Sequence, residues 1–194
     1  MTKSIHTSLI TLGLVTATAT MPVMAATAQE AEPVAEQKLV EVRLVDTIDE
    51  DRGYCLDIAG GKGANAPLDK GMQAHTCYDY TGGLLEDQSF DEALLKAGQF
   101  KIVYFDICMT ASAVETDASI ELASCDNSLD TQQFSLEENG NLVMKSKPEL
   151  CVTVNATEKR EGRGAKPVHV MRPLSLQACS EDNAKYQTWS LFSF

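Results

Sequence analysis

Histidine is scarce in this sequence, and no zinc motif is present. Of 194 residues only three are histidines, and only His75 and His169 lie beyond the first 25 residues. Neither stands in a recognisable nucleophile or metal motif, and no Cys-x-x-Cys pair occurs. The sequence therefore disfavours a catalytic triad and a zinc site, and we expect neither an enzyme nor a cofactor.

Positive charge is also scarce. The chain has 16 lysines and arginines against 28 acidic residues, which gives a net charge of −12. This excess of acid argues against nucleic acid, anionic membranes and sulfated polysaccharides as partners. A local exception is a glycine-containing basic insertion with Lys159, Arg160, Arg163 and Lys166. It is either a solvated mobile loop or a docking surface for an acidic partner.

Long apolar runs are missing as well. The apolar stretch around residues 9–15 is diluted by threonines and is shorter than the about 20 residues that a membrane span needs. Lys3 precedes it and the small residues Val23-Met-Ala25 follow, an order typical of a secretory signal peptide. We expect a signal peptide over residues 1–25, with an uncleaved anchor as the alternative, and a flexible acidic spacer over residues 26–38. The protein would then be secreted or periplasmic.

Helical periodicity is largely absent from the remainder, and apolar residues alternate as in half-buried strands. Alternation is found in Val40-Val42-Leu44, Phe100-Ile102-Tyr104, Ile120-Leu122 and Val168-Val170. The dipeptide Asn139-Gly140 favours a two-residue hairpin turn between residues 134–136 and 142–144. A weak helical pattern over residues 84–95 is interpreted as a loop or a short helical turn. The pattern predicts an all-β domain.

Six cysteines divide this domain into three similar modules, which predicts a threefold internal repeat. The modules open with Cys55-Leu-Asp, Cys108-Met-Thr and Cys151-Val-Thr, and each contains a later motif, Gln88-Ser-Phe90, Gln132-Gln-Phe134 or Gln187-Thr-Trp189. The first cysteines are 53 and 43 residues apart, a spacing typical of repeated supersecondary units. We place the repeats at about 39–98, 99–144 and 145–194.

Export would allow these cysteines to form disulfides. Six cysteines permit 15 connectivities. The pairing that respects the repeat joins Cys55 to Cys77, Cys108 to Cys125, and Cys151 to Cys179.

Three recurrences of Cys-x-Asp or Cys-x-Thr, a second cysteine and Gln-x-aromatic resemble the ricin-B-type β-trefoil lectins over residues 39–194. The resemblance implies a single β-trefoil domain of about four strands per repeat. It also implies that Phe90, Phe134 and Trp189 pack in a shared core. The implied function is sugar binding in shallow pockets, of galactose type in this family, without catalysis.

The sugar pattern of the family is an acid two residues after the first cysteine, a polar residue four before the second, an aromatic two before it, and Asn-Gln. The first repeat matches this pattern most closely, with Asp57, Gln73, His75, Asp87 and Gln88. His75 replaces a larger ring and Asp87 replaces an amide. Asp57 is alternatively a turn residue stabilised by local hydrogen bonds.

The other two repeats lack the acid, because Thr110 and Thr153 occupy its position. We therefore expect an exported lectin-like protein with at most one sugar site. The alternative is a non-catalytic module that binds a protein partner and whose sugar sites are degenerate. A further alternative is glycoside hydrolysis by an acid–base cluster of His75, Asp57 and Asp87.

An acidic cluster precedes the first cysteine, at Asp46, Asp49, Glu50 and Asp51. It suggests calcium, but the full twelve-residue loop ending in a bidentate acid is missing. We therefore expect no metal site.

N-terminal sequencing of the exported chain tests the signal peptide. We expect cleavage near Ala25 or Ala26 because small residues precede the scissile bond in signal peptides. A membrane-associated chain that still carries residues 1–25 would show instead that this segment is an anchor.

Overall fold

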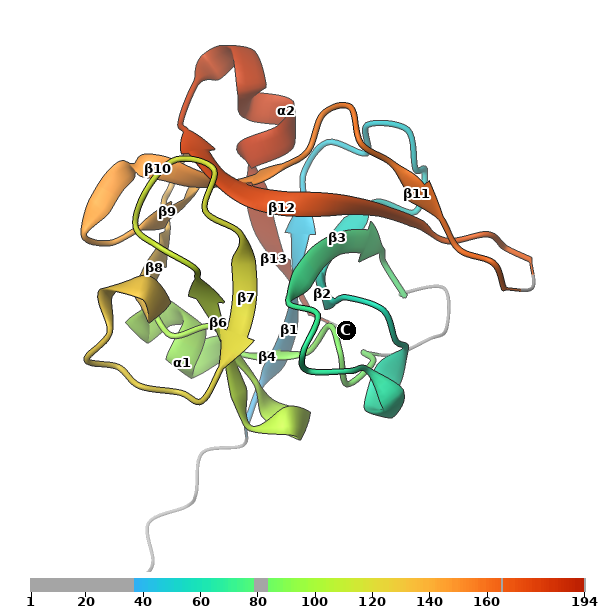
Figure 1. Cartoon of the computed structure of the whole chain (residues 1–194), viewed down its shortest axis with the longest axis horizontal. Coiled ribbons are helices and arrows are strands. Elements are labelled where there is room, and N and C mark those ends of the chain that lie inside the picture. The colour runs from blue at the N-terminus through green and yellow to red at the C-terminus, as the bar shows by residue number, and fades with distance from the viewer. Residues whose placement is uncertain (1–36, 79–83, 165, 194) are drawn as a thin grey trace, which may run out of the picture. The chain divides into compact units, whose positions relative to one another are not determined.

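A computed structural model of the chain describes residues 37–78, 84–164 and 166–193 (Figure 1). The expected signal peptide and nearly all of the expected spacer lie outside these residues. None of the helices within the described ranges is long and apolar enough to cross a membrane.

The described residues form an all-β fold whose strands fall into three sets of four, as the resemblance predicted. An additional short strand, β11, belongs to the third set, and the remaining ordered elements are short helices and 3-10 turns. The first set is β1 (Leu39–Leu44), β2 (Tyr54–Ile58), β3 (Met72–Thr76) and β4 (Phe90–Asp91). The second is β5 (Lys101–Ile102), β6 (Ile107–Ala111), β7 (Ile120–Ala123) and β8 (Phe134–Leu136). The third is β9 (Leu142–Met144), β10 (Lys147–Val154), β12 (Val170–Ala178) and β13 (Trp189–Phe192), with β11 (Arg160–Glu161) inserted.

Six of these strands follow one another in a ring. β1 is antiparallel to both β13 and β4, β4 pairs with β5, and β8 pairs with β9. Two single hydrogen bonds continue the ring, from Phe134 N to Gly98 O at 2.9 Å and from Trp189 N to Gly140 O at 2.7 Å. The other strands form the hairpins β2–β3, β6–β7 and β10–β12. A ring of six strands with one hairpin per repeat is a β-trefoil.

The aromatic residues of the Gln-x-aromatic motifs lie in the core, which confirms the interpretation from the sequence. Phe90, Phe134 and Trp189 are all buried. Phe100 joins two of them through edge-to-face contacts, with ring centroids 6.1 Å from Phe90 and 5.7 Å from Phe134. The Trp189 indole nitrogen donates to Val152 O at 3.0 Å, so its polar atom is satisfied inside the core. The three repeats therefore share one apolar centre.

Two of the four predicted strands end earlier or begin later than expected. Strands do run through Val40-Val42-Leu44 and Ile120-Leu122, but β5 stops at Ile102 and β12 starts at Val170. A 3-10 turn, η3 (Val103–Phe105), follows β5 and leaves Tyr104 59% exposed. Asp106 then adopts a positive φ of 53°, which turns the chain into β6. Alternation of apolar residues alone did not reveal this turn.

The hairpin around Asn139-Gly140 exists, but its loop is longer than predicted. Gly140 N donates to Glu137 O and Glu137 N donates to Asn141 O, both at 2.9 Å. Gly140 alone takes a positive φ, 86°, in this loop. The loop is therefore a β-turn followed by a left-handed glycine. A side chain at Gly140 would also collide with Thr188, because a Cβ there would lie 2.6 Å from its methyl group.

The weak helical pattern corresponds to a shorter and later helix. Helix α1 (Glu92–Ala97) begins at Asp91, whose side chain accepts a hydrogen bond from Leu94 N, and ends at Gly98 in the left-handed conformation. Residues 84–89 are not helical. The described residues also form η1 (Gly63–Asn65), η4 (Asp130–Gln132), η5 (Glu181–Asn183) and helix α2 (Ala184–Gln187).

Three disulfides cross-link the hairpins, one in each repeat. They join Cys55 to Cys77, Cys108 to Cys125 and Cys151 to Cys179. In the loop-entropy model, closed loops of 22, 17 and 28 residues each contribute on the order of 3 kcal/mol to stability.

Replacing Phe100 with alanine should lower the free energy of unfolding by about 3–5 kcal/mol, because a fully buried ring that contacts Phe90 and Phe134 is lost. Denaturant unfolding with the disulfides intact measures the change. Tyr104→Ala is the control, since that ring is exposed and should change the stability by less than about 0.5 kcal/mol. Equal effects at both positions would refute the shared core.

Candidate functional site

The glutamine of each Gln-x-aromatic motif is buried and bonds to the backbone around the second cysteine of its repeat. This shared contact explains why the same motif recurs after each cysteine pair. In the second repeat, Gln132 Nε2 donates to Ser124 O and Gln132 Oε1 accepts from Asp126 N, at 2.9 and 2.8 Å. In the third repeat, Gln187 Nε2 donates to Ala178 O and Gln187 Oε1 accepts from Ser180 N, both at 3.0 Å. Gln88 Nε2 correspondingly lies 3.3 Å from Thr76 O.

Asp57 occupies a closed position in the first repeat. It lies on β2, its side chain is fully buried, and it accepts hydrogen bonds from Gln88 Nε2 and Gln73 Nε2, each at 2.8 Å. In the third repeat Thr153 Oγ1 accepts the same kind of bond from Gln187 Nε2 at 2.9 Å. The residue two places after the first cysteine therefore ties the hairpin to the Gln-x-aromatic motif in both repeats.

Asp87 is a second fully buried carboxyl group beside Asp57. Its Oδ2 accepts a hydrogen bond from Gly63 N at 2.7 Å, and its Oδ1 is buried with no hydrogen-bond partner among the described residues. Burial raises the pKa of Asp87 to about 6. Burial, followed by the charge of Asp87, raises the pKa of Asp57 well above its usual range. The two acids therefore resist being ionised together.

His75, on β3, belongs to a cluster of three rings. Its ring centroid lies 5.0 Å from those of Tyr78 and His169, which are themselves 5.2 Å apart. Its Nδ1 is 2.7 Å from Thr76 O, a contact in which the nitrogen is the donor. Burial lowers the pKa of His75 to about 4, so its imidazole is neutral at pH 7. His169 is only partly buried and comes from the third repeat.

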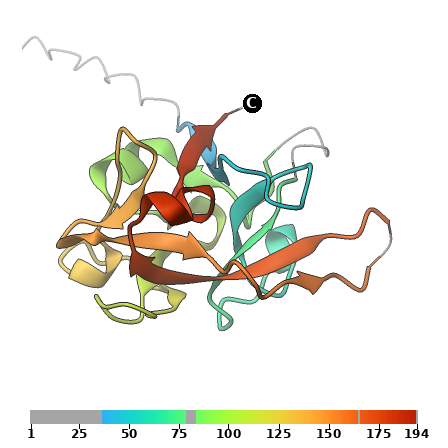
Figure 2. The same ribbon diagram turned by 90° about the horizontal axis from the view of Figure 1, so that it is seen from above.

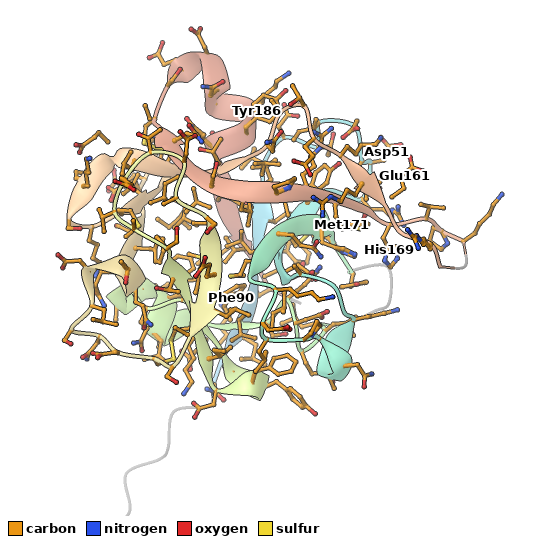
Figure 3. All side chains as sticks on the ribbon, in the orientation of Figure 1. Asp51, Phe90, Glu161, His169, Met171 and Tyr186 are labelled. Carbon is orange, nitrogen blue, oxygen red and sulfur yellow. A yellow bond between two sulfur atoms is a disulfide. The ribbon has the colours of Figure 1, made fainter. Side chains whose placement is uncertain are left out.

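A cavity of about 830 Å³ lies beside this cluster, between the first repeat and the β11–β12 hairpin. Gln73, His75, Tyr78, His169 and Met171 contribute side chains to its wall. Figure 3 shows His169 and Met171 at the base of the hairpin, where β12 passes β3.

The five residues that the sequence pattern selected divide into two groups. Gln73 and His75 line the cavity, whereas Asp57, Asp87 and Gln88 are fully buried and do not. Gln73 separates the two groups, since it lines the cavity and also donates to Asp57.

Sequence reasoning missed several cavity residues, most of all His169, Tyr78, Lys62 and Lys70. Tyr78 directly follows the second cysteine, a position that the family pattern does not include. Lys62 follows a close turn of the β2–β3 loop, in which a Cβ on Gly61 would lie 2.3 Å from the Ala66 Cα. His169 was only an interior position of a predicted strand, and no local signal indicated its contact with the first repeat.

The β11–β12 hairpin is held against the first repeat by backbone and side-chain contacts. β12 is antiparallel to β3, with Met171 opposite His75 and Arg172 opposite Ala74. The buried Arg172 donates to Tyr54 Oη and to Asp49 Oδ2, both at 3.1 Å. Figures 1 and 2 show this hairpin extending from the rest of the domain past β3. The basic insertion is thus part of an anchored hairpin rather than only a solvated loop.

The acidic cluster before the first cysteine forms ion pairs. Asp49 binds Arg172 and Lys159, and Glu50 binds Arg52 at 2.7 Å. Burial alone would raise the pKa of Asp49, but hydrogen bonds from Lys159, Tyr54 and Arg172 outweigh it and lower the pKa to about 2. Asp49 therefore connects the first repeat to the third, whereas Glu50 makes its ion pair within the first repeat.

The second repeat has a more open cavity of about 750 Å³, lined by residues that include Gln99, Ser124, Asp126 and Leu129. Within the described part of the chain, neither an aromatic ring nor a cation belongs to that lining. Thr110 and Thr153 are buried in their hairpins.

The buried acids predict a pH-dependent stability. The pKa of Asp87 rises from 3.8 to about 6 on folding, so the folded chain binds more protons in this range and its stability falls as the pH rises from about 4 to about 6. Asp87→Asn should remove this loss and be more stable than the original chain by about 1–2 kcal/mol at pH 7, with little difference at pH 4.

Denaturant unfolding at the two pH values measures the effect, with the exposed Asp69→Asn as the control. A stability difference for Asp87→Asn that is the same at both pH values would contradict the assignment.

Comparison with known proteins supports the fold. Among solved structures, the C-half of an earthworm R-type lectin in complex with GalNAc matches with a TM-score of 0.55 and 14% identity, over 81% of this chain and 99% of that chain. An agglutinin from Abrus precatorius matches with a TM-score of 0.53 and 15% identity, over 81% and 47%. The mdaA-1 domain matches with a TM-score of 0.54 and 16% identity, over 87% and 97%.

Because the sequence identities are this low, these matches show a shared fold and nothing more. The comparison with curated protein sequences gives no significant match. A family model, the ricin-type beta-trefoil lectin domain, matches residues 44–189, which is most of the chain. The chain therefore belongs to the ricin-type β-trefoil lectin family.

Proposed function

We propose that this protein is an exported, non-catalytic carbohydrate-binding protein with one sugar site, in the cavity beside the first repeat. The family supports carbohydrate binding in general, and the similar earthworm lectin structure contains GalNAc. The observation that carries the proposal is that Gln73 and three aromatic rings meet in one cavity of about 830 Å³. A cavity of this size suits a small saccharide.

The side chains around the cavity match the chemistry of a sugar. Asp57 holds the Nε2 of Gln73, which orients the amide and makes its carbonyl oxygen the acceptor for a sugar hydroxyl. The partly buried His169 supplies a ring for the apolar face of the sugar, backed by His75 and Tyr78. In this proposal Asp57 positions Gln73 instead of contacting the sugar, because Asp57 is fully buried.

The same burial argues against hydrolysis by the two acids. Asp57 and Asp87 both lie outside the cavity lining, so a glycosidic bond in the cavity would not lie between them. We therefore propose binding without catalysis.

The proposed export rests on the disulfides. Three disulfides form and persist in an oxidising compartment. A secreted or periplasmic location agrees with the signal-peptide pattern of residues 1–25.

A protein-binding module is the second candidate. The observation that favours it concerns Asp57, the acid that the family pattern expects to contact a sugar. Its side chain is fully buried and bonded to Gln73, so it does not reach the cavity. The sugar site of the first repeat would then be degenerate, like those of the other two repeats, and the domain would bind a protein partner.

A glycan array with the oxidised mature protein separates the two candidates. We expect the unchanged protein to bind at least one glycan, and Gln73→Ala to weaken that binding about tenfold, because one hydrogen bond to the sugar is lost. Ser175→Ala is the matched control, since it lies four residues before the second cysteine of the third repeat.

Asp57→Asn, which keeps the shape of the side chain, should also weaken binding by disturbing Gln73. If the folded protein binds no glycan, the protein-binding module becomes the better-supported function. Loss of binding in Ser175→Ala alone would place the site in the third repeat.

A further inference from the structure

The cavity beside the first repeat is bordered by basic side chains, although the chain as a whole carries a net charge of −12. Lys62 and Lys70 come from the β2–β3 loop, and Arg160 and Lys166 come from the β11–β12 hairpin. Among the residues that the structure describes, no aspartate or glutamate belongs to this lining. Two segments that are about 100 residues apart in sequence therefore place positive charge on opposite sides of one cavity.

Most of these basic side chains form no ion pair within the described ranges. Arg160 is paired with Glu158, with its Nη2 2.6 Å from a carboxylate oxygen. Lys62, Lys70 and Lys166 form no ion pair with any residue in the described ranges. The Nζ atom of Lys62 instead lies 5.3 Å from the centre of the Tyr78 ring. Three ammonium groups thus remain available to an anion in the cavity.

Burial is the main cause that keeps the two histidines of the cavity neutral, and Lys62 adds to it at His169. Burial lowers the pKa of His169, and the charges of Arg52 and Lys62 lower it further. Burial is also the largest cause of the lowered pKa of His75. Both rings are therefore neutral at pH 7 and can contact a ligand without adding charge, while the lysines supply the charge.

The rest of the molecule limits the size of the anion. A long polyanion would extend beyond the cavity and be repelled by a chain with a net charge of −12, whereas a single acidic group inside the cavity would contact the local lysines. The amide of Gln73 and the ring of His169 are the groups that would bind an uncharged sugar ring next to that acidic group.

We infer that the ligand of this cavity is a short acidic saccharide, in which a carboxylate or sulfate group lies among Lys62, Lys70 and Lys166 and the sugar ring lies against Gln73 and His169. This inference rests on the proposed sugar-binding function and adds the substrate class. The net charge still disfavours sulfated polysaccharides, whereas local charge decides the binding of a small anion.

Titration calorimetry with matched sugars tests the inference. The probes are galactose, galacturonic acid, galactose 6-sulfate and inorganic sulfate, each with the oxidised mature protein at low salt. We expect the acidic sugar that fits to bind about tenfold more tightly than galactose, and this preference to shrink in 0.5 M salt. Comparison of the two acidic sugars shows whether the cavity prefers a carboxylate or a sulfate.

The double variant Lys62→Gln and Lys166→Gln removes one charge from each side of the cavity. It should weaken binding of the acidic sugar about fivefold or more and leave galactose binding unchanged. Lys185→Gln is the matched control, because its Nζ atom also lies above a tyrosine ring, 4.8 Å from the centre of Tyr186, but it is not part of the cavity. All three lysines are exposed, so these changes should not disturb folding.

Three results would overturn the inference. Equal binding of galactose and both acidic sugars, unchanged in the double variant, would leave the sugar site standing and remove its preference for acid. Inorganic sulfate binding as tightly as galactose 6-sulfate would show an anion site that does not recognise the sugar. Absence of binding by every sugar on the glycan array and by calorimetry would remove the proposed function together with the inference.

Discussion

The antiparallel pairing of β12 with β3 is the interaction on which the candidate site depends. It places Met171 opposite His75 and brings the third repeat against the first. Arg172 strengthens this junction, because its buried guanidinium group binds Tyr54 and Asp49 of the first repeat. Without this junction the cavity would have one wall, and His169, Arg160 and Lys166 would lie apart from Gln73.

Buried polar contacts give each repeat its internal order and also explain the closed state of Asp57. The motif glutamine bonds to the backbone on both sides of the second cysteine in the second and third repeats. The residue two places after the first cysteine binds that glutamine in the first and third repeats. Asp57 does so by accepting hydrogen bonds from two amide groups, and the loss of its hydration raises its pKa. A residue type that suggests ligand binding in the sequence can therefore serve folding and act on a ligand only through its neighbour.

Much of the fold could be predicted because its signals are local or repeated. Period-two alternation identified β1 and β7, and three matched cysteine pairs indicated the repeat and the disulfides within it. The predictions from the sequence were wrong where the chain turns. Tyr104 lies in a 3-10 turn instead of a strand, and Gly140 has the left-handed conformation in a loop that is longer than predicted. Such turns depend on the space that neighbouring elements leave, as the contact of Gly140 with Thr188 shows, and not on apolar periodicity.

The sequence by itself determined the β-rich repeat, the aromatic core positions and the choice of the first repeat as the candidate sugar site, because each of these follows from residue types at regular spacings. The tertiary structure alone decided which of the chosen side chains reach the cavity. It buried Asp57 and Asp87, left Gln73 accessible, and added Tyr78 and His169. The physical reason is that strand pairing between distant repeats, rather than spacing within one repeat, sets which side chains share a cavity and which charges face each other.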